Sequence, residues 1–271
     1  MKNKLRLMIA VIYIFSVNLL TAQSKEKVLS AGFNTSLHSE YLNENRTLSV
    51  YLPKDYDQNN DDYAVLYILD GDFFSLFLEG ISATNYLHDM QDYPEFIIVG
   101  IHTKKNRDRD LVPSKMNTQN KNVNNFLKFL TEELKPYIEK EYRTTNYNIL
   151  FGASNGGLFA LYTLLNKPYC FDAIISISPS IGHCPDLLKE QVKLFVKNAS
   201  QKKKPIYFNY GKTDNPYTLD FLPQFFTFFK EILPVNYPVK LELIESQGHV
   251  PFGSIFEGLK YTFSQRGAGY K

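Results

Sequence analysis

Residues 147–157, which read YNILFGASNGG, constrain the fold of this chain more than any other stretch. The first half is a short apolar run, which is typical of a strand buried on both faces of a sheet. The second half has the pattern G-x-S-x-G with Ser154 at its centre, and good helix formers follow it over residues 158–165. The stretch therefore predicts a strand, a tight turn and a helix, with a serine at the turn.

Small residues flank the serine where such a turn needs them. Gly152 and Gly156 lie two residues either side of Ser154, where larger side chains would collide with each other and with the helix. The bend would lift the Ser154 hydroxyl out of the sheet and direct the first helical N–H groups toward the space above it, where an oxyanion would be stabilised. The same spacing also arises by chance, so a glycine-rich turn without a catalytic role is the alternative.

Apolar runs and helical periodicity alternate along the rest of the chain. Strands are predicted over residues 28–38, 47–52, 64–69, 96–101, 147–151, 172–178, 205–210 and 239–245. Helices are predicted over residues 74–90, 122–142, 158–165, 185–198, 216–233 and 254–264, with a kink at Pro136 and a polar loop before the second helix. This order predicts an α/β fold with a mostly parallel eight-stranded sheet, an N-terminal antiparallel hairpin and helices on both faces.

The N-terminus has the pattern of a secretory signal peptide over residues 1–22. Lys2, Lys4 and Arg6 precede a mostly apolar stretch over residues 7–20, and small residues follow at the expected cleavage point. The apolar stretch is too short and too interrupted for a membrane span. We therefore expect a periplasmic or secreted protein, without stable membrane insertion after cleavage, in which residues 23–271 form one domain.

Charge and cysteine content exclude several classes of function. The whole chain carries 30 Lys and Arg against 28 Asp and Glu, and cleavage after residue 22 would remove three basic residues, which leaves a formal charge of −1. A nucleic-acid partner is not expected, because the strongly basic face that it requires is missing. Cys170 and Cys184 flank the strand predicted at 172–178, about 20 Å long, so we expect neither a disulfide nor a metal site. No pattern in the sequence predicts the oligomeric state.

A serine hydroxyl is an effective nucleophile only when a base takes its proton. His249 follows the last predicted strand, at the carboxyl edge where doubly wound sheets carry their active sites, and a surface loop histidine is the alternative. Asp214, after the strand at 205–210, is the expected acid, with Asp186 as the fallback and a turn-forming aspartate as the alternative. The resulting order Ser, acid, His is that of the α/β-hydrolase fold.

Two backbone amides are candidates for the oxyanion hole. One is that of Asn155, directly after the serine, and the other is that of Asp72, in the loop after the strand at 64–69. His102 and His183 also follow predicted strands, so we expect them to line the rim of the pocket rather than to catalyse.

The chain resembles the family called Putative esterase within the α/β-hydrolases, and within that family the siderophore esterases of the enterobactin and bacillibactin type. The stretches that carry the resemblance are VLYILDGDFF at 65–74, NRDRDLVPS at 106–114, LTEELKPYIEKEYRT at 130–144, ILFGASNGGLFALYTLL at 149–165, FDAIISISPS at 171–180 and GHVPFGSIFEGLKYTF at 248–263. This chain has Ala153 where the family often has His, and Asn155 where an aromatic residue is common.

The resemblance implies an α/β-hydrolase domain over residues 23–271 that hydrolyses a small-molecule carboxylic ester through an acyl-enzyme on Ser154, without a cofactor. It implies that Arg107 and Arg109 lie near the pocket mouth, where a cation could meet an acidic or catechol substrate; arginines paired with nearby carboxylates are the alternative. A Ser–His dyad without Asp214 also stays open. So do a feruloyl or acetyl polysaccharide esterase, an acyltransferase on the same fold, and a ligand-binding protein without catalysis.

Overall fold

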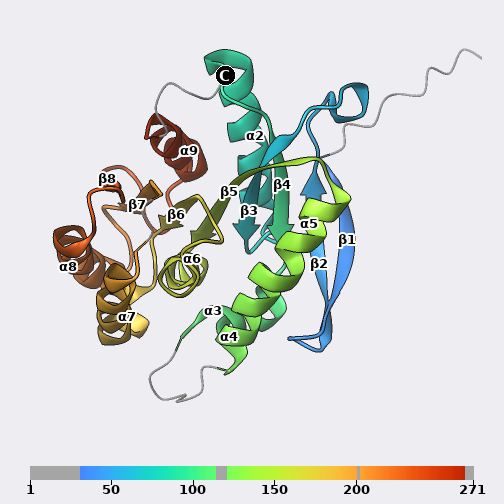
Figure 1. Ribbon diagram of the computed structural model, residues 1–271. Helices are drawn as coiled ribbons and strands as arrows, with labels where there is room; N and C mark the ends of the chain where they lie inside the picture. The colour runs from blue at the N-terminus through green and yellow to red at the C-terminus, as the bar shows by residue number, and fades with distance from the viewer. Residues whose placement is uncertain (1–30, 114–120, 200–201, 266–271) are drawn as a thin grey trace, which may run out of the picture. The chain divides into compact units, whose positions relative to one another are not determined.

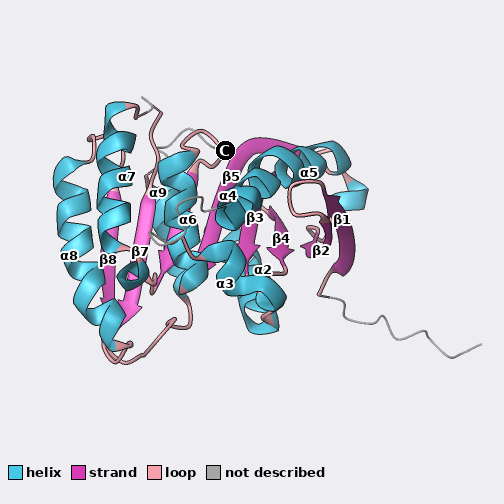
Figure 2. Cartoon of the chain, turned by 90° about the horizontal axis from the view of Figure 1, so that it is seen from below, coloured by secondary structure: helices cyan, strands magenta, loops and turns pink. Residues whose placement is uncertain are grey.

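The computed structural model describes residues 31–113, 121–199 and 202–265. The predicted signal peptide, residues 1–22, lies outside them. The described strands form an eight-stranded sheet in the order β1-β2-β4-β3-β5-β6-β7-β8 (Figure 1). Figure 2 shows the strands side by side in this order.

The sheet is antiparallel at its N-terminal edge and parallel elsewhere, as the sequence predicts. β1 pairs antiparallel with β2, and β2 pairs antiparallel with β4, whereas every other neighbouring pair is parallel. The predicted α/β-hydrolase architecture is therefore confirmed. The strands are β1 (Phe33–Ser39), β2 (Glu44–Tyr51), β3 (Tyr63–Leu69), β4 (Phe96–Ile101), β5 (Thr144–Ala153), β6 (Ala173–Ile177), β7 (Ile206–Gly211) and β8 (Val239–Ile244).

The continuous apolar strands have a core on each face of the sheet. Every residue of β3 is buried, and successive side chains point to opposite faces. Val65 and Tyr67 belong to the larger core cluster, whereas Leu66 and Ile68 belong to the second one. A strand with two buried faces cannot alternate apolar and polar residues, which explains the uninterrupted apolar run.

Helices cover both cores. α2 (Phe74–Gln91) and α9 (Ser254–Ser264) pack on the smaller one. The other described α-helices contribute to the larger one, and they are α3 (Arg107–Leu111), α4 (Lys121–Lys128), α5 (Lys135–Glu141), α6 (Asn155–Asn166), α7 (Pro185–Lys197) and α8 (Pro216–Ile232). Short 3-10 turns lie at Tyr56–Gln58, Lys104–Asn106 and Ile181–His183.

The segment predicted as one helix over residues 122–142 is helical from 121 to 141, but its middle part, Phe129–Leu134, is π-helical. The Lys135 N–H donates to the carbonyl of Leu130, five residues earlier, instead of four. Pro136 follows directly, and its ring has no N–H to continue a regular α-helical pattern. The proline therefore interrupts regular helical bonding at the predicted position, and the wider π turn before it accommodates the ring.

The segment after β4 differs from the prediction of an irregular polar loop. It forms the short turn Lys104–Asn106 and then α3 (Arg107–Leu111). Arg109 pairs with Asp110 on the same helix and with Glu44 at the start of β2. The pair with Glu44 joins residues 65 positions apart in the chain, so hydrophobic periodicity could not have predicted the helix.

Three features are missing from the described part of the chain. No helix there is long and apolar enough to cross a membrane. No group of three or more His, Cys, Asp or Glu side chains is arranged there to hold a metal ion. Cys170 and Cys184 are not joined in a disulfide, and β6 lies between them in the chain.

Leu188 and Leu194 on α7 provide a matched test of the larger core. Leu188 is fully buried, whereas Leu194 is 60% exposed. We expect Leu188→Ala to lower the free energy of unfolding by about 2–5 kcal/mol because it leaves a cavity, and Leu194→Ala to change it by less than about 0.5 kcal/mol. Urea denaturation of both variants measures the difference, and equal effects would contradict the assignment of this helix face to the core.

Candidate active site

Ser154 lies at the turn between β5 and α6, in the predicted order of strand, turn and helix. Its backbone has φ 57° and ψ −119°, a conformation that non-glycine residues rarely adopt. The Ser154 N–H donates to the carbonyl of Ile177 on β6 at 2.8 Å, and the Ser154 carbonyl accepts the Leu158 N–H at 3.0 Å. The strained conformation is thus anchored to the neighbouring strand and to the following helix.

Gly152 makes this turn sterically feasible. A Cβ atom added at Gly152 would lie 2.1 Å from the carbonyl oxygen of Gly156, on the first turn of α6. No side chain fits at that distance, so the predicted need for glycine at position 152 has a direct structural cause.

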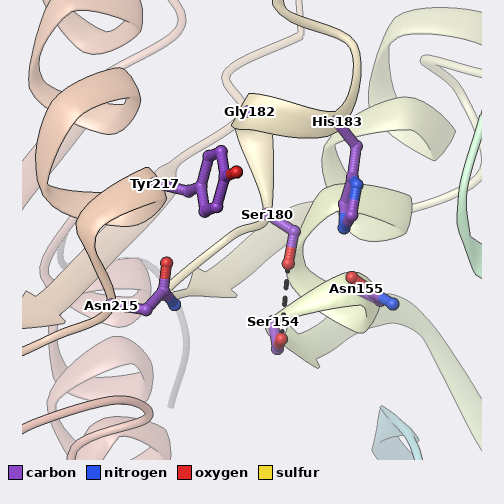
Figure 3. Close-up of a pocket in the computed structure, with 7 residues that line it drawn as sticks. All are labelled: Ser154, Asn155, Ser180, Gly182, His183, Asn215 and Tyr217. Atoms are coloured by element: carbon purple, nitrogen blue, oxygen red, sulfur yellow. Dashed lines mark hydrogen bonds between the residues drawn. The ribbon is translucent and has the colours of Figure 1, made fainter.

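The Ser154 side chain borders a cavity of about 410 Å³ at the carboxyl edge of the sheet. Within the pocket the Ser154 hydroxyl lies 3.3 Å from that of Ser180 (Figure 3). His183 lies in the turn after β6 and borders the same cavity. The lining residues are Ser154, Asn155, Ser180, Gly182, His183, Asn215 and Tyr217.

His249 and Asp214 meet in the loops that follow β8 and β7. His249 Nδ1 lies 2.6 Å from Asp214 Oδ1, and the histidine side chain is 38% exposed while that of Asp214 is fully buried. The two loops approach backbone to backbone, because a Cβ atom at Gly211 would lie 2.1 Å from the Gly248 carbonyl oxygen. The sheet therefore brings together two residues that are 35 positions apart in the sequence.

Hydrogen bonds keep the Asp214 carboxylate ionised. Oδ1 also accepts from the N–H and the side-chain amide of Asn215, and Oδ2 accepts from the Ser178 hydroxyl at 2.6 Å. Burial alone would raise the pKa of Asp214, but the bonds from His249, Ser178 and Asn215 outweigh it and lower the pKa below its ordinary value. A carboxylate held in this way favours the imidazole tautomer with its proton on Nδ1, which leaves Nε2 as the basic nitrogen.

No hydrogen bond joins Ser154 to His249 in the described part of the chain. The two sites are nevertheless adjacent, because Asn215 borders the pocket with Ser154 while its side-chain nitrogen lies 3.1 Å from His249 Nδ1. In unliganded active sites the catalytic hydrogen bonds are often long and shorten only when substrate binds.

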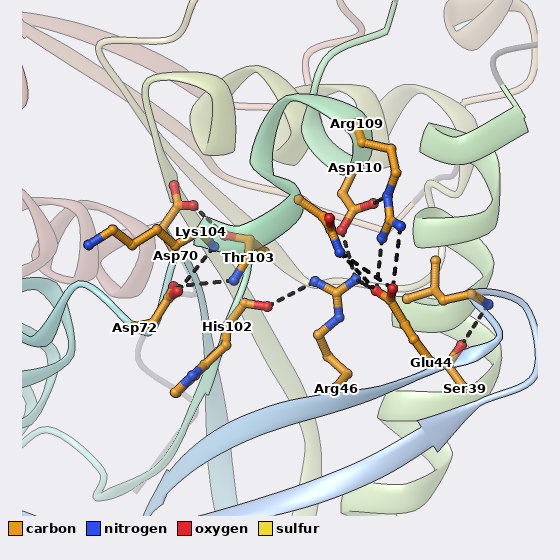
Figure 4. A network of polar contacts seen from close by, with 12 residues as sticks. Ser39, Glu44, Arg46, Asp70, Asp72, His102, Thr103, Lys104, Arg109 and Asp110 are labelled. Carbon is orange, nitrogen blue, oxygen red and sulfur yellow. Dashed lines mark hydrogen bonds and ion pairs between the residues drawn. The ribbon is translucent and has the colours of Figure 1, made fainter.

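Of the two residues predicted to supply oxyanion amides, Asn155 lines the pocket and Asp72 does not. Asn155 is the first residue of α6, so its N–H has no acceptor within the helix. The Asp72 carboxylate accepts the N–H groups of Thr103 at 3.2 Å and Lys104 at 3.0 Å, which fixes the loop after β3 (Figure 4). Among the described residues neither the Asp72 amide nor the Asn155 amide donates a hydrogen bond.

Arg107 and Arg109 are engaged by protein carboxylates. Arg107 donates to both oxygens of the buried Asp70 at 2.9 and 2.8 Å, and also to the Ala153 carbonyl at 3.2 Å. Arg109 is held by Glu44 and Asp110 (Figure 4). Neither arginine is among the residues that line the pocket. Both arginines are therefore paired with nearby carboxylates, which is the alternative that the sequence left open.

The other polar residues singled out in the sequence lie as follows. His102 is within 2.8 Å of the Ser49 hydroxyl on β2, burial lowers the pKa of its ring, and it is not one of the lining residues. Asp186 lies in the first turn of α7, and it is Asp214 that contacts His249.

Sequence reasoning missed several residues that complete the site. Asn215 and Tyr217 line the pocket at the start of α8, and Ser180 and Gly182 line it after β6. The available signal was position, because Ser180 and Asn215 are polar residues that follow parallel strands, and the carboxyl ends of parallel strands lie at the same edge of the sheet. Tyr217 had no signal of this kind among the chain's many tyrosines.

The sequence matches the model of the family called Putative esterase over residues 39–250. The chain belongs to this family. One of its curated relatives is the ferri-bacillibactin esterase BesA of Bacillus subtilis (strain 168), which is 28% identical to this chain over 185 residues. That alignment covers 60% of this chain and 64% of BesA, so it spans less than two thirds of the relative's length.

Solved structures support the same fold. The IroE-like serine hydrolase from Shewanella oneidensis is 28% identical, with a TM-score of 0.72 over 86% of this chain and 80% of that chain. The siderophore hydrolase EstB from Aspergillus nidulans is 21% identical, with a TM-score of 0.72 over 92% of this chain and 100% of that chain. At that identity the likeness to EstB concerns the fold alone.

The lowered pKa of Asp214 predicts a pH-dependent contribution to stability. A carboxyl whose folded-state pKa is depressed stabilises the fold above its unfolded pKa of about 3.9 and loses this contribution as the pH falls through the folded value. We expect Asp214→Asn to be less stable than wild type near pH 6, and the difference to narrow below about pH 4. Chemical denaturation across this range measures it, and a constant difference would contradict the prediction.

Proposed function

We propose that this member of the esterase family is a serine carboxylic-ester hydrolase that works through an acyl-enzyme on Ser154. The observation that carries the proposal is the position of Ser154, held with φ 57° at the border of a pocket that also adjoins the Asp214–His249 pair. A strained serine of this kind, next to a histidine with a carboxylate partner, is the arrangement that activates a hydroxyl for attack.

In the proposed reaction His249 Nε2 takes the proton of the Ser154 hydroxyl while the serine oxygen attacks the ester carbonyl carbon. The tetrahedral intermediate collapses when the imidazolium returns that proton to the departing alkoxide, which leaves as an alcohol. His249 then takes a proton from water, whose oxygen attacks the acyl-enzyme carbonyl carbon. When the second tetrahedral intermediate collapses, the imidazolium gives that proton to the Ser154 oxygen, and the acid is released. Asp214 stabilises the imidazolium throughout and does not itself accept the proton.

The amides of Asp72 and Asn155 are the proposed donors to the oxyanion. One such donor is worth about 3 kcal/mol of transition-state stabilisation, to judge from the removal of single donors in other hydrolases. The hydrogen bonds from Thr103 and Lys104 to the Asp72 carboxylate support this role, because they hold the loop without using its amide.

The proposed substrate class is an ester of a siderophore. The support comes from the ferri-bacillibactin esterase among the relatives, and from a cavity whose volume of about 410 Å³ is in the range that holds part of such a ligand. Tyr217 and His183 provide ring surfaces at opposite sides of the view in Figure 3, with polar groups of Asn155 and Asn215 below them.

Replacing the nucleophile tests the mechanism. We expect Ser154→Ala to lower kcat/KM for p-nitrophenyl acetate at least about 10³-fold, because the variant lacks the hydroxyl that forms the acyl-enzyme. Ser36→Ala, an exposed serine on β1, is the matched control and should retain wild-type activity. Unchanged hydrolysis by the Ser154 variant would reject the serine mechanism.

Asp214→Asn, measured with the same ester, separates a triad from a dyad. A triad predicts a loss of up to about 10⁴-fold in kcat, because the wrong imidazole tautomer then predominates. An Asp214 variant with most of its activity, beside an inactive Ser154 variant, would instead indicate a Ser–His dyad.

The substrate class is tested by direct comparison of two esters. We expect kcat/KM to be at least about tenfold higher for ferric enterobactin than for methyl ferulate, since a pocket that hydrogen-bonds a substrate discriminates against ligands that leave its polar groups unpaired. Product formation by liquid chromatography measures both rates, with Ser154→Ala as the blank. Faster cleavage of methyl ferulate would favour a feruloyl esterase instead.

A further inference from the structure

The short turn Ser178–Pro179–Ser180, directly after β6, contacts Ser154, Asp214 and the loop that carries His249. The Ser180 N–H donates to the Ser154 carbonyl at 3.2 Å, and the two serine hydroxyls lie 3.3 Å apart (Figure 3). On its other side the turn reaches Asp214 and the loop that carries His249, through Ser178. None of these contacts depends on substrate.

Ser178 is fully buried and makes two hydrogen bonds with its single hydroxyl. The hydroxyl donates to Asp214 Oδ2 at 2.6 Å and accepts the N–H of Val250, the residue after His249, at 3.0 Å. The two contacts are compatible, because the hydroxyl donates its one proton to the carboxylate and a lone pair of its oxygen accepts the Val250 N–H. The Ser178 N–H is fixed in turn by the Asn209 carbonyl on β7 at 2.8 Å.

These contacts constrain the acid and the base together. Without a donor at Oδ2 the Asp214 carboxylate could rotate about its terminal bond and lose its alignment with His249 Nδ1. Without an acceptor for its N–H, Val250, which has a φ of 56°, would lose an anchor for the backbone next to the histidine. A carboxylate aligned by a second donor keeps the imidazole in one orientation before substrate arrives.

We propose that Ser178 is a positioning residue that aligns the Asp214–His249 pair for attack by Ser154. This inference rests on the proposed serine mechanism. Ser178 does not border the pocket, so it acts through Asp214 and the Val250 backbone and not on the substrate.

The competing explanation is that Ser178 serves only the backbone. Its φ is 42°, in the left-handed region that favours glycine over other residues. Ser178→Gly separates the two explanations, because glycine keeps or relaxes this backbone conformation while it removes the hydroxyl. If the backbone alone mattered, the glycine variant would be as active as wild type.

We expect Ser178→Gly to lower kcat for p-nitrophenyl acetate at least about tenfold, the loss associated with one hydrogen bond to a charged group, and to leave KM within about twofold of wild type. Ser176→Ala is the matched control, since Ser176 is also fully buried on β6 but donates only to the Gly157 carbonyl. The control should retain the wild-type ratio of kcat to KM even if it lowers stability.

A double-mutant cycle adds a readout that a purely structural role would not change. In an Asp214→Ala background the Ser178 hydroxyl has no carboxylate to align, so the further loss on Ser178→Gly should shrink below about twofold. A loss of the same size in both backgrounds, or a glycine variant with wild-type kcat, would overturn the inference.

Labelling of Ser154 by a fluorophosphonate, followed by mass spectrometry, separates this inference from the proposed function. We expect one label per wild-type chain, none in Ser154→Ala, and complete but at least about tenfold slower labelling in Ser178→Gly. An unlabelled wild type would reject the serine mechanism and this inference with it. Labelling of the glycine variant at the wild-type rate would reject the role of Ser178 alone.

Discussion

The close backbone contact between Gly152 and Gly156 is the constraint on which the rest of the site depends. It lets β5 turn into α6 within one residue, and the cost is the unfavourable φ of Ser154. That cost is offset locally, because Ser154 is bonded to Ile177 on β6 and to Leu158 on α6. The same parallel strands that anchor the turn end at one edge of the sheet, and their loops carry the remaining polar groups.

Among the buried carboxylates at this edge, Asp70 and Asp214 have partners that give them different roles. Asp70 is held by Nε and Nη2 of one arginine, Arg107, and by the hydroxyl of Thr103, so its charge is neutralised within the fold. Asp214 is held by neutral donors and by one titratable ring that is more than a third exposed. A fixed guanidinium suits a structural contact, whereas a partner that gains and loses a proton suits catalysis.

Most of the fold could be predicted from the sequence because its signals are local. The run Phe96–Ile101 and the helix Ser254–Ser264 are observed with their predicted bounds, since apolar content and flanking turn residues define such elements. The helix α3 could not be predicted in this way, because ion pairs with distant residues hold it. Regular periodicity also concealed the π-helical segment Phe129–Leu134.

The candidate site could be predicted from the sequence only in part, because some of its contacts join residues from distant parts of the chain. Ser154, Asp214 and His249 each follow a predicted strand, so topology placed them at one edge, and the structure confirms that Asp214 and His249 are in contact. Whether an arginine is paired or free to meet a substrate depends on which carboxylates lie near it in space. Spacing along the chain does not reveal these neighbours. The same is true of Ser178, whose two partners come from loops 36 and 72 positions further along the chain.

The contact between Gly211 and Gly248 has a consequence for how such a site can diversify. Because the two main chains touch there, an insertion in either loop would part the acid from the base. Gly182 and His183 border the cavity from the turn after β6, which does not carry that pair. A different side chain at His183 would therefore change what the cavity accepts without parting Asp214 from His249.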